Sequence, residues 1–436
     1  MKKSTGRRER RAGWAEAMTP CRSSKFAAWK RVVLAIFCGA GLAACLSPVV
    51  VPRHGAIDAR PCDDSSPVTH SVFLIGDAGA PALPLDGSTE LVDPVLRGLS
   101  TDVAHAVAAL DTDRVVVIFL GDNVYWDGLA PQGHRFRRHG ERVLEAQIAA
   151  SAPVRAVFLL GNHDWHVEGP EGWNRALEQR RFLEPFAPRV RMLPPGGCAG
   201  PERLDVGRYL RFVLIDPIGF GHLADHHEEH VAACKDRDVV EAFLDLADEF
   251  DHPDGRHVAL ALHHPLITAG SHGGHYGWKQ HLFPLTDFWP RAWVPLPIIG
   301  SVYPLSRQLG VTRTDATHES YARYIQSIYR ASRPLVPLLY VGGHEHNLQL
   351  HRDLVGAYYL VSGAGSVSKI DRVSSDHLDT TMMATARPGY MRLDVTANGS
   401  LDLTVLALDG GAHPKPVYRH CLADGPPRPR SRSTPD

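Results

Sequence analysis

The stretch from Arg114 to Tyr125 reads RVVVIFLGDNVY and decides the fold class. Six apolar residues in a row suit a strand that is buried on both faces, as in a parallel sheet. A glycine and polar residues follow at once, and in open α/β sheets ligand sites form just beyond the carboxyl ends of the strands. The stretch therefore predicts a buried strand that delivers Asp122 and Tyr125 to a site.

Similar apolar runs recur along the chain, and most end at glycine, aspartate, asparagine or histidine. Helical patterns separate several of them, at 102–110, 135–150 and 237–250. This alternation predicts an α/β fold, and the lack of helical patterns between the last three runs predicts a more antiparallel second sheet. The expected strands are 71–75, 114–120, 155–160, 208–215, 257–262, 335–341, 357–361, 390–395 and 401–406.

Five strands or turns end in clusters of side chains that bind metal ions. The clusters are GDAG (76–79), GDNVY (121–125), GNHD (161–164), LHHP (262–265) and GHEHN (343–347). Their carboxylate, amide, imidazole and phenol groups suit Fe, Mn and Zn, and they include no thiolate. Seven candidate donors exceed one tetrahedral site and suit two metals with a bridging carboxylate, for which Asp122 is the natural choice.

In this order, the five motifs resemble the signature of the calcineurin-like metallophosphoesterases. Together with the segment SGAG (362–365), they are more narrowly similar to purple acid phosphatases of the small, tartrate-resistant type. The motifs cover roughly residues 71–365. The resemblance implies a four-layer αββα sandwich in which helices flank two mixed sheets. It also implies two metal ions, Fe(III) and a divalent ion that could be Fe, Zn or Mn.

The resemblance also implies a role for each motif residue. Asp122 resembles the bridge. The ferric ligands would be Asp77, Tyr125 and His346, and the divalent ligands would be Asn162, His263 and His344.

Tyr125 distinguishes this branch of the family. Most members have Asp-x-His in the first motif, but here Gly79 stands in the place of that histidine and cannot coordinate. Tyr125 would supply the missing donor and give a coloured tyrosinate–iron band. The alternative is an aromatic side chain that packs beside the site.

Two histidines are candidate catalytic residues under the same resemblance. His163 would contact the phosphate or the leaving oxygen, with Asp164 orienting its ring. His272 lies nine residues after His263, as a second histidine of the small branch does, and could protonate the leaving oxygen. His264 is the less favoured ligand, because the family uses the first residue of His-x-Pro.

The implied reaction is phosphomonoester hydrolysis by an acid phosphatase, with a metal-bound hydroxide attacking phosphorus. The substrates would then be small phosphate esters. Two alternatives stay open. One is a phosphodiesterase or nucleotide pyrophosphatase with the same metals. The other is a surface lipoprotein that binds a partner through a Trp/Pro-rich insertion at 273–316.

That insertion contains Trp278, Trp289 and Trp293 together with several prolines, and its pattern predicts no regular helix or strand. It suits a lid beside the site, a surface that meets a membrane or partner, or a segment that packs on its own domain.

The chain joins a basic leader to an acidic body. The formal net charge of −1 argues against nucleic acid as a partner, and it averages +8 for residues 1–44 with −9 for the remainder. Residues 32–44 form an apolar run too short to span a bilayer, and it ends in LAAC (42–45), which looks like a bacterial lipobox. We therefore expect an exported protein, anchored by lipid on Cys45 and sorted to the outer membrane, where it would face the periplasm or the surface. The alternative is a plain signal peptide cut near Ala44.

The predicted organisation follows from these features. It comprises a signal peptide (1–44), a tether (45–67), one metallophosphoesterase domain (68–422) and a disordered tail (423–436). Four cysteines would remain besides Cys45, and export suggests two disulfides. Three pairings are possible, and four free thiols are the alternative. One arrangement would tie the ends of the domain together through Cys62 and Cys421, leaving Cys198 and Cys234 in loops on either side of one strand.

Overall fold

The computed structural model describes residues 61–62, 65–169, 171–224, 234–236, 238–287, 292–333, 336–373 and 379–427. The predicted signal peptide, Cys45 and most of the tether lie outside this part of the chain, as do residues 428–436 of the predicted tail. Among the described residues, no helix is both long enough and apolar enough to cross a membrane.

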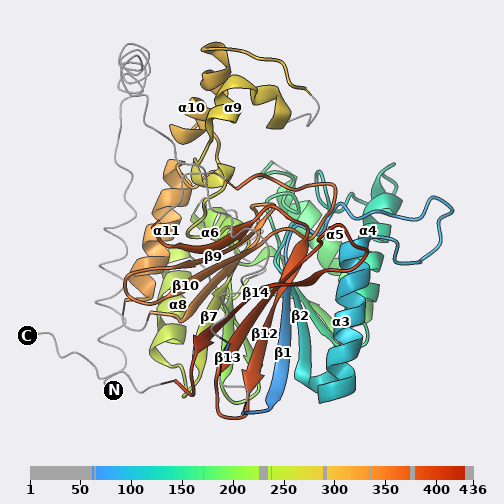
Figure 1. The fold of residues 1–436 in the computed structure, drawn as a ribbon, viewed down its shortest axis with the longest axis vertical. Coiled ribbons are helices and arrows are strands. Elements are labelled where there is room, and N and C mark those ends of the chain that lie inside the picture. Colours follow the sequence, from blue (N-terminus) through green and yellow to red (C-terminus); the bar gives the residue numbers. More distant parts are fainter. Residues whose placement is uncertain are drawn as a thin grey trace, which may run out of the picture. The chain divides into compact units, whose positions relative to one another are not determined.

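The first sheet has seven strands in the order β14-β13-β12-β1-β2-β3-β4. Figure 1 labels β14, β13, β12, β1 and β2 of this sheet. The four strands from β1 to β4 run parallel, whereas β12, β13 and β14 add antiparallel to β1 and to one another. The bounds are β1 (Val68–Ile75), β2 (Val115–Phe119), β3 (Arg155–Phe158), β4 (Val190–Met192), β12 (Gly389–Thr396), β13 (Leu401–Ala407) and β14 (Lys415–Ala423).

The second sheet also has seven strands, in the order β11-β9-β10-β8-β7-β6-β5. Its central strands β10, β8, β7 and β6 are parallel, and β9, β11 and β5 pair antiparallel with their neighbours. The bounds are β5 (Glu202–Val206), β6 (Leu210–Leu214), β7 (His257–Ala261), β8 (Leu339–Gly342), β9 (Leu348–Arg352), β10 (Tyr358–Ser362) and β11 (Thr381–Thr385).

Two mixed sheets are thus confirmed, but the last three runs do not together form the more antiparallel second sheet that the sequence predicts. The run at 357–361 becomes β10 of the second sheet, while those at 390–395 and 401–406 become β12 and β13 of the first. The chain returns to the open edge of β1, because pairing there satisfies the backbone groups of that strand.

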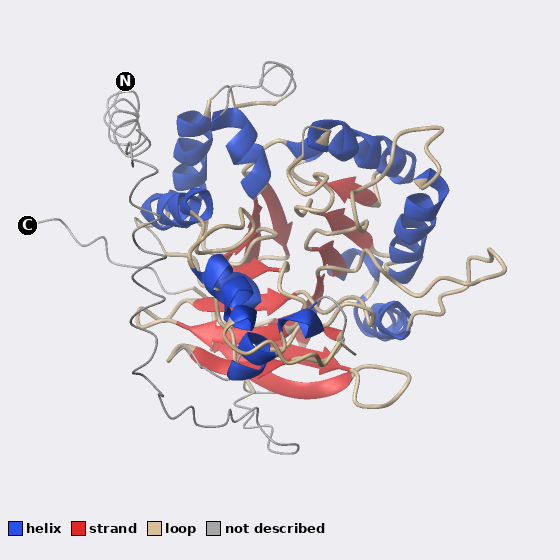
Figure 2. Cartoon of the chain, turned by 90° about the horizontal axis from the view of Figure 1, so that it is seen from above, coloured by secondary structure: helices blue, strands red, loops and turns tan. Residues whose placement is uncertain are grey.

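Each sheet has one face toward the other sheet and one toward helices, which gives the expected four layers. On β1, Val72 and Leu74 belong to the core between the sheets, whereas Phe73 and Ile75 pack under the helices. Figure 2 shows helices outside both sheets. Those over the first sheet are α3 (Pro94–Leu110), α4 (Arg137–Ala150) and α5 (Gly172–Leu183); those beside the second are α6 (Pro217–Ala224), α8 (Val239–Asp251) and α11 (Glu319–Ala331).

The insertion is more regular than its sequence predicts. It contains the short helices α9 (Trp278–Leu282) and α10 (Val302–Gln308), which stand above the strands in Figure 1. The prediction of no regular helix there is therefore wrong. The helices have only five and seven residues, which is too short for a helical period of apolar residues to be recognised in the sequence.

Two disulfides join the four cysteines of the described chain. Cys62 pairs with Cys421, so the residues before β1 are tied to β14, the last strand. Cys198 pairs with Cys234. Of the possibilities left open by the sequence, this is the pairing that ties the ends of the domain together.

Candidate metal centre

The five predicted clusters each begin within three residues of a strand end, after β1, β2, β3, β7 and β8. The first three strands are adjacent and parallel in one sheet, and the last two are adjacent and parallel in the other. His344 N donates to Asp77 Oδ2 (2.7 Å), so the carboxyl ends of both sets open on the same end of the sandwich. Backbone hydrogen bonds link the loops, since Asp77 N donates to Gly121 O (3.0 Å) and Gly343 N donates to His263 O (2.8 Å).

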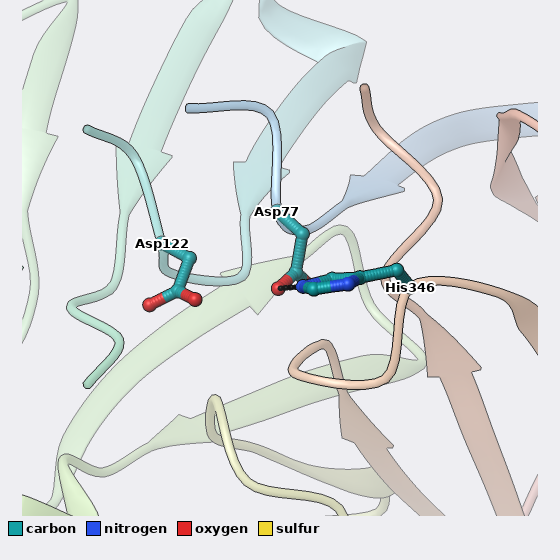
Figure 3. Close-up of side chains that lie close together, drawn as sticks. All are labelled: Asp77, Asp122 and His346. Carbon is teal, nitrogen blue, oxygen red and sulfur yellow. Dashed lines mark ion pairs between the residues drawn. The ribbon is translucent and has the colours of Figure 1, made fainter. Parts of the chain in front are cut away.

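One group of side chains gathers around Asp77. The hydroxyl of Tyr125 donates to Asp77 Oδ1 (2.9 Å) and lies 3.1 Å from His346 Nε2. His346 Nε2 is 3.5 Å from Asp77 Oδ1, the pair joined by a dashed line in Figure 3. Asp77, Asp122 and His346 are all buried, and each offers one ligand atom within 4.8 Å of the others. This group could hold a metal ion.

A second group gathers around Asn162. Its Oδ1 lies 2.9 Å from His344 Nδ1 and 3.1 Å from His263 Nε2. Asp122 Oδ1 is 3.4 Å from the same nitrogen of His263. Asp122 therefore lies between the two groups, with one of its oxygens facing the second. All seven donors predicted from the sequence lie together.

Each histidine of these groups is anchored through its other ring nitrogen. His346 Nδ1 is 2.7 Å from Asp371 Oδ2, His263 Nδ1 is 2.8 Å from Leu120 O, and His344 Nε2 is 2.8 Å from Thr314 O. Metal-binding histidines commonly have such a carboxylate or carbonyl partner, which sets the tautomer and the direction of the free lone pair. The arrangement leaves Nε2, Nε2 and Nδ1, respectively, facing the donors.

Burial shapes the charges of the centre. It raises the pKa of Asp77 well above its ordinary value, and the neighbouring Asp122 carboxylate raises it further. Burial, then Asp122 and Asp77, likewise raise the pKa of the Tyr125 phenol. Burial lowers the pKa of His263, so its imidazole is held neutral, as a ligand must be. Two buried carboxylates and a phenol are costly together without a cation, and a bound cation offsets that cost.

The backbone around the donors is unusual in the same places. Asp77, Asp122 and His344 have φ angles of 59°, 54° and 68°, in the left-handed region that few residues other than glycine adopt. Such strain persists where the surroundings over-determine it, and it clusters at functional sites. The donor set, the neutral imidazole of His263 and the three strained donors together fit a pair of metal ions.

Gly79 explains why no histidine stands in the first motif. A Cβ there would lie 2.5 Å from the Asp122 carbonyl oxygen and 2.7 Å from Val124 N, so no side chain fits. The Gly79 carbonyl accepts a hydrogen bond from Tyr125 N (3.2 Å), and this contact brings the phenol to the first group.

His163 lies at the rim of the centre. Its Nε2 is 3.9 Å from Asp122 Oδ2, and its Nδ1 is 2.6 Å from the Trp126 carbonyl oxygen. The prediction that Asp164 orients this ring is wrong. The Asp164 carboxylate accepts instead from the backbone N–H groups of Gly161, Asn123 and Val124, at 2.9 to 3.1 Å, and so ties the second loop to the third.

His272 also reaches the centre, with its ring centroid 4.0 Å from that of His344. His264 packs between His344 and Tyr321, with ring centroids 4.4 and 5.3 Å away, and no contact joins it to Asn162.

Sequence reasoning missed several residues of the centre. Lys369 places its ammonium 3.4 Å from the Tyr125 ring centroid and 4.4 Å from that of Trp126. Lys369 and Asp371 follow the segment SGAG (362–365) closely, so that motif indicated the correct loop. Thr314 contributes only its backbone carbonyl. Every residue type has this group, so the sequence could not indicate the contact.

Comparisons with known proteins give a likeness to solved structures alone. No protein-family model matches the chain, and no curated protein does. One similar structure is GAP50, the anchor in the inner membrane complex of Plasmodium, at 13% identity over 83% of this chain and 90% of that one (TM-score 0.47). Another is the purple acid phosphatase PPD1 from yellow lupin seeds, at 14% identity over 82% and 55% (TM-score 0.45). PhoD matches at 12% identity over 81% and 69% (TM-score 0.48). At these values we infer no activity from the likeness.

Proposed function

We propose that this chain is a dinuclear-metal phosphoesterase, and specifically an acid phosphatase of the small purple type that acts on phosphomonoesters. The supporting observation is the position of Asp122. Its carboxylate lies within reach of Asp77 and His346 on one side and 3.4 Å from His263 on the other. A shared carboxylate between two sets of hard donors suits two metal ions held close together.

The proposed division of ligands follows the two groups. One ion, Fe(III), would take Asp77, Tyr125 and His346; a divalent ion would take Asn162, His263 and His344. When bound, such ions supply Lewis acidity toward a phosphoryl oxygen and lower the pKa of water.

Residues of the chain that are not metal ligands would bind the phosphate and supply a proton. His163, whose Nδ1–H is held by the Trp126 carbonyl oxygen, would donate a hydrogen bond from Nε2 to the phosphate as the imidazolium ion. Lys369 adds a positive charge at the rim, where a dianionic ester would approach. His272 would give a proton to the leaving oxygen.

Metal content and hydrolysis test this proposal together. The purified protein should contain two metal ions per chain and hydrolyse p-nitrophenyl phosphate, and chelation should abolish both. Asp122→Asn should lose metal and activity, whereas Asp409→Asn, an exposed aspartate in an ion pair with Arg387, should keep both. Two bound metals without hydrolysis of any phosphate monoester or diester would refute the proposal. Diester rates above monoester rates would favour the phosphodiesterase alternative.

Colour tests the role of Tyr125 separately. A phenolate on Fe(III) gives a visible absorption band, so Tyr125→Phe should bleach the iron-loaded protein. An unchanged band would remove Tyr125 from the site.

Binding of a partner protein is a second candidate function, and the surface of the insertion favours it. Among its described residues, nine large apolar side chains are exposed, and a large exposed apolar surface is typical of interaction sites. Replacing Ile298 and Ile299 with serine should weaken such binding and leave hydrolysis intact. The nine are Trp278, Trp293, Val294, Ile298, Ile299, Val302, Leu305, Leu309 and Val311.

We further propose that the protein is exported and anchored in the outer membrane by lipid on Cys45. Cells fed labelled palmitate should label the protein, and Cys45→Ser should abolish the label and release the protein from membranes. Labelling that survives this change would refute the proposal.

A further inference from the structure

His272 is held by two side chains that the insertion supplies. Its Nδ1 lies 2.9 Å from Asp315 Oδ1. Arg307, from α10, donates through Nε to Asp315 Oδ2 (2.8 Å) and through Nη2 to Asp315 Oδ1. Asp315 is fully buried, and the Arg307 side chain is 12% exposed. Arg307 Nη2 also lies 3.0 Å from His272 Nδ1, but its hydrogen bond goes to Asp315 Oδ1. An ionised carboxylate can only accept, so the proton between Asp315 and the imidazole belongs to Nδ1.

The backbone of His272 is fixed as well. Its N–H donates to Glu345 Oε1 (2.7 Å), and its carbonyl oxygen accepts from Ala316 N (2.8 Å). Within the described part of the chain, His272 Nε2 has no hydrogen-bond partner, and the side chain is 17% exposed. The ring therefore has one nitrogen fixed by the protein and one that a ligand can reach.

The same segment of the insertion also contacts the proposed divalent site. Thr314, next to Asp315, accepts from His344 Nε2 through its carbonyl (2.8 Å), and His344 Nδ1 faces Asn162. Two consecutive residues of the insertion thus hold two histidines whose rings lie 4.0 Å apart.

We infer that Asp315, supported by Arg307, is a positioning residue that orients His272 for proton transfer, and that the insertion is a built-in part of the active site. An aspartate that fixes one ring nitrogen presents the other to the reacting atoms, as in other His–Asp pairs. The inference rests on the proposed function, since a proton donor matters only where an ester is cleaved. The tautomer of His272 does not depend on that function.

The step itself is balanced. As the ester P–O bond breaks, its electron pair stays on the leaving oxygen, which takes the proton from His272 Nε2 and departs as an alcohol. Water supplies the oxygen that replaces it on phosphorus, and a proton of that water restores the imidazolium. Such proton transfer contributes most where the leaving group is a strong base.

Nitrogen NMR tests the orientation without any assay of activity. Protein labelled with [15N]histidine and loaded with zinc, which is diamagnetic, should show His272 protonated on Nδ1, the signal being identified by its loss in His272→Gln. Asp315→Asn should remove or redistribute that proton, whereas Arg313→Gln, at an exposed position of the same segment, should leave it unchanged. The same Nδ1–H signal in Asp315→Asn and wild type would overturn the inference.

Leaving-group dependence tests the consequence. Asp315→Asn should lower kcat roughly 100-fold for an alkyl phosphate and far less for p-nitrophenyl phosphate, whose leaving group needs no proton, with KM and zinc content unchanged. Asp315→Glu should recover part of the loss. Equal losses for the two substrates would overturn the inference. If wild type cleaves no ester, the proposed function fails, and the NMR result still decides the orientation.

Asp315→Asn removes a buried charge beside Arg307, so the variant could be unable to fold, which circular dichroism would reveal. In that case Arg307→Lys takes its place, because lysine keeps the charge but cannot bind both oxygens of Asp315 at once. A mixed population of His272 tautomers is then expected, and a wild-type spectrum would overturn the inference.

Discussion

Asp371 offers the sharpest test of the candidate metal centre, because it touches a proposed ligand without being one. Its Oδ2 lies 2.7 Å from His346 Nδ1, and its N–H donates to the His346 carbonyl (3.0 Å). The first contact requires the side chain and the second does not. Substitution at this position should therefore leave the loop in place and loosen only the imidazole.

The magnitude follows from that geometry. Losing the outer partner of a ligating histidine typically weakens metal binding about 10- to 100-fold. Asp371→Asn keeps an uncharged acceptor for Nδ1–H, and the native carboxylate is 39% exposed, so we expect the lower end, about tenfold, or 1.4 kcal/mol. Asp371→Ala leaves no acceptor and should approach 100-fold.

Competition between the protein and a chelator for zinc measures the dissociation constants of the two metal ions. Only one of the two binding steps should shift, because Asp371 has no contact with the group around Asn162. Asp409→Asn serves as the matched control. Unchanged binding in both Asp371 variants would refute the role given to the Asp371–His346 pair, and an equal shift of both steps would refute the division into two groups.

Three further predictions concern charge, pH and the disulfides. Lys369→Met should raise the inhibition constant of inorganic phosphate roughly tenfold and tighten metal binding, since one positive charge leaves the rim; titration calorimetry measures both. Burial raises the pKa of Asp216 to about 7, so its proton is held more tightly in the folded chain, and stability falls as pH rises from about 4 to 7, by about 4 kcal/mol at most. Urea midpoints of Asp216→Asn should fall less than those of wild type over that range. Replacing Cys198 and Cys234 with serine opens a loop with a sequence separation of 36 residues and should cost about 4 kcal/mol of unfolding free energy at most.

Central strands could be predicted from the sequence, and edge strands could not. The runs that became β1, β2 and β7 are buried at nearly every position, so an apolar stretch marks them. β14 reads KPVYRHCLA and has one buried residue, and β5 reads ERLDV and has two. Such strands form because they pair with a neighbouring strand. The local sequence pattern gives no information about that neighbour.

Some missed elements did have a signal. α11, ESYARYIQSIYRA, places Tyr321, Ile328 and Ala331 on one buried face at helical spacing. α3 was expected only from residue 102, although Asp93 and Pro94 form a strong start, with Asp93 Oδ1 accepting from Val95 N and Leu96 N. The capping residue Asp93 and the proline after it therefore mark the first turn of this helix in the sequence.

In the candidate centre, too, one part could be predicted from the sequence and another could not. Side chains that face a metal ion are restricted by chemistry to a few types, so their order and spacing are visible in a sequence. The atoms that hold those side chains in place are under no such restriction. His263 and His344 are anchored by the carbonyls of Leu120 and Thr314, and any residue has a carbonyl. Substituting the side chain of Thr314 should therefore change little, whereas a shift of its backbone would reorient His344. The insertion therefore positions His344 through a backbone carbonyl. The path of the backbone decides this contact, and that path is visible only in a structure.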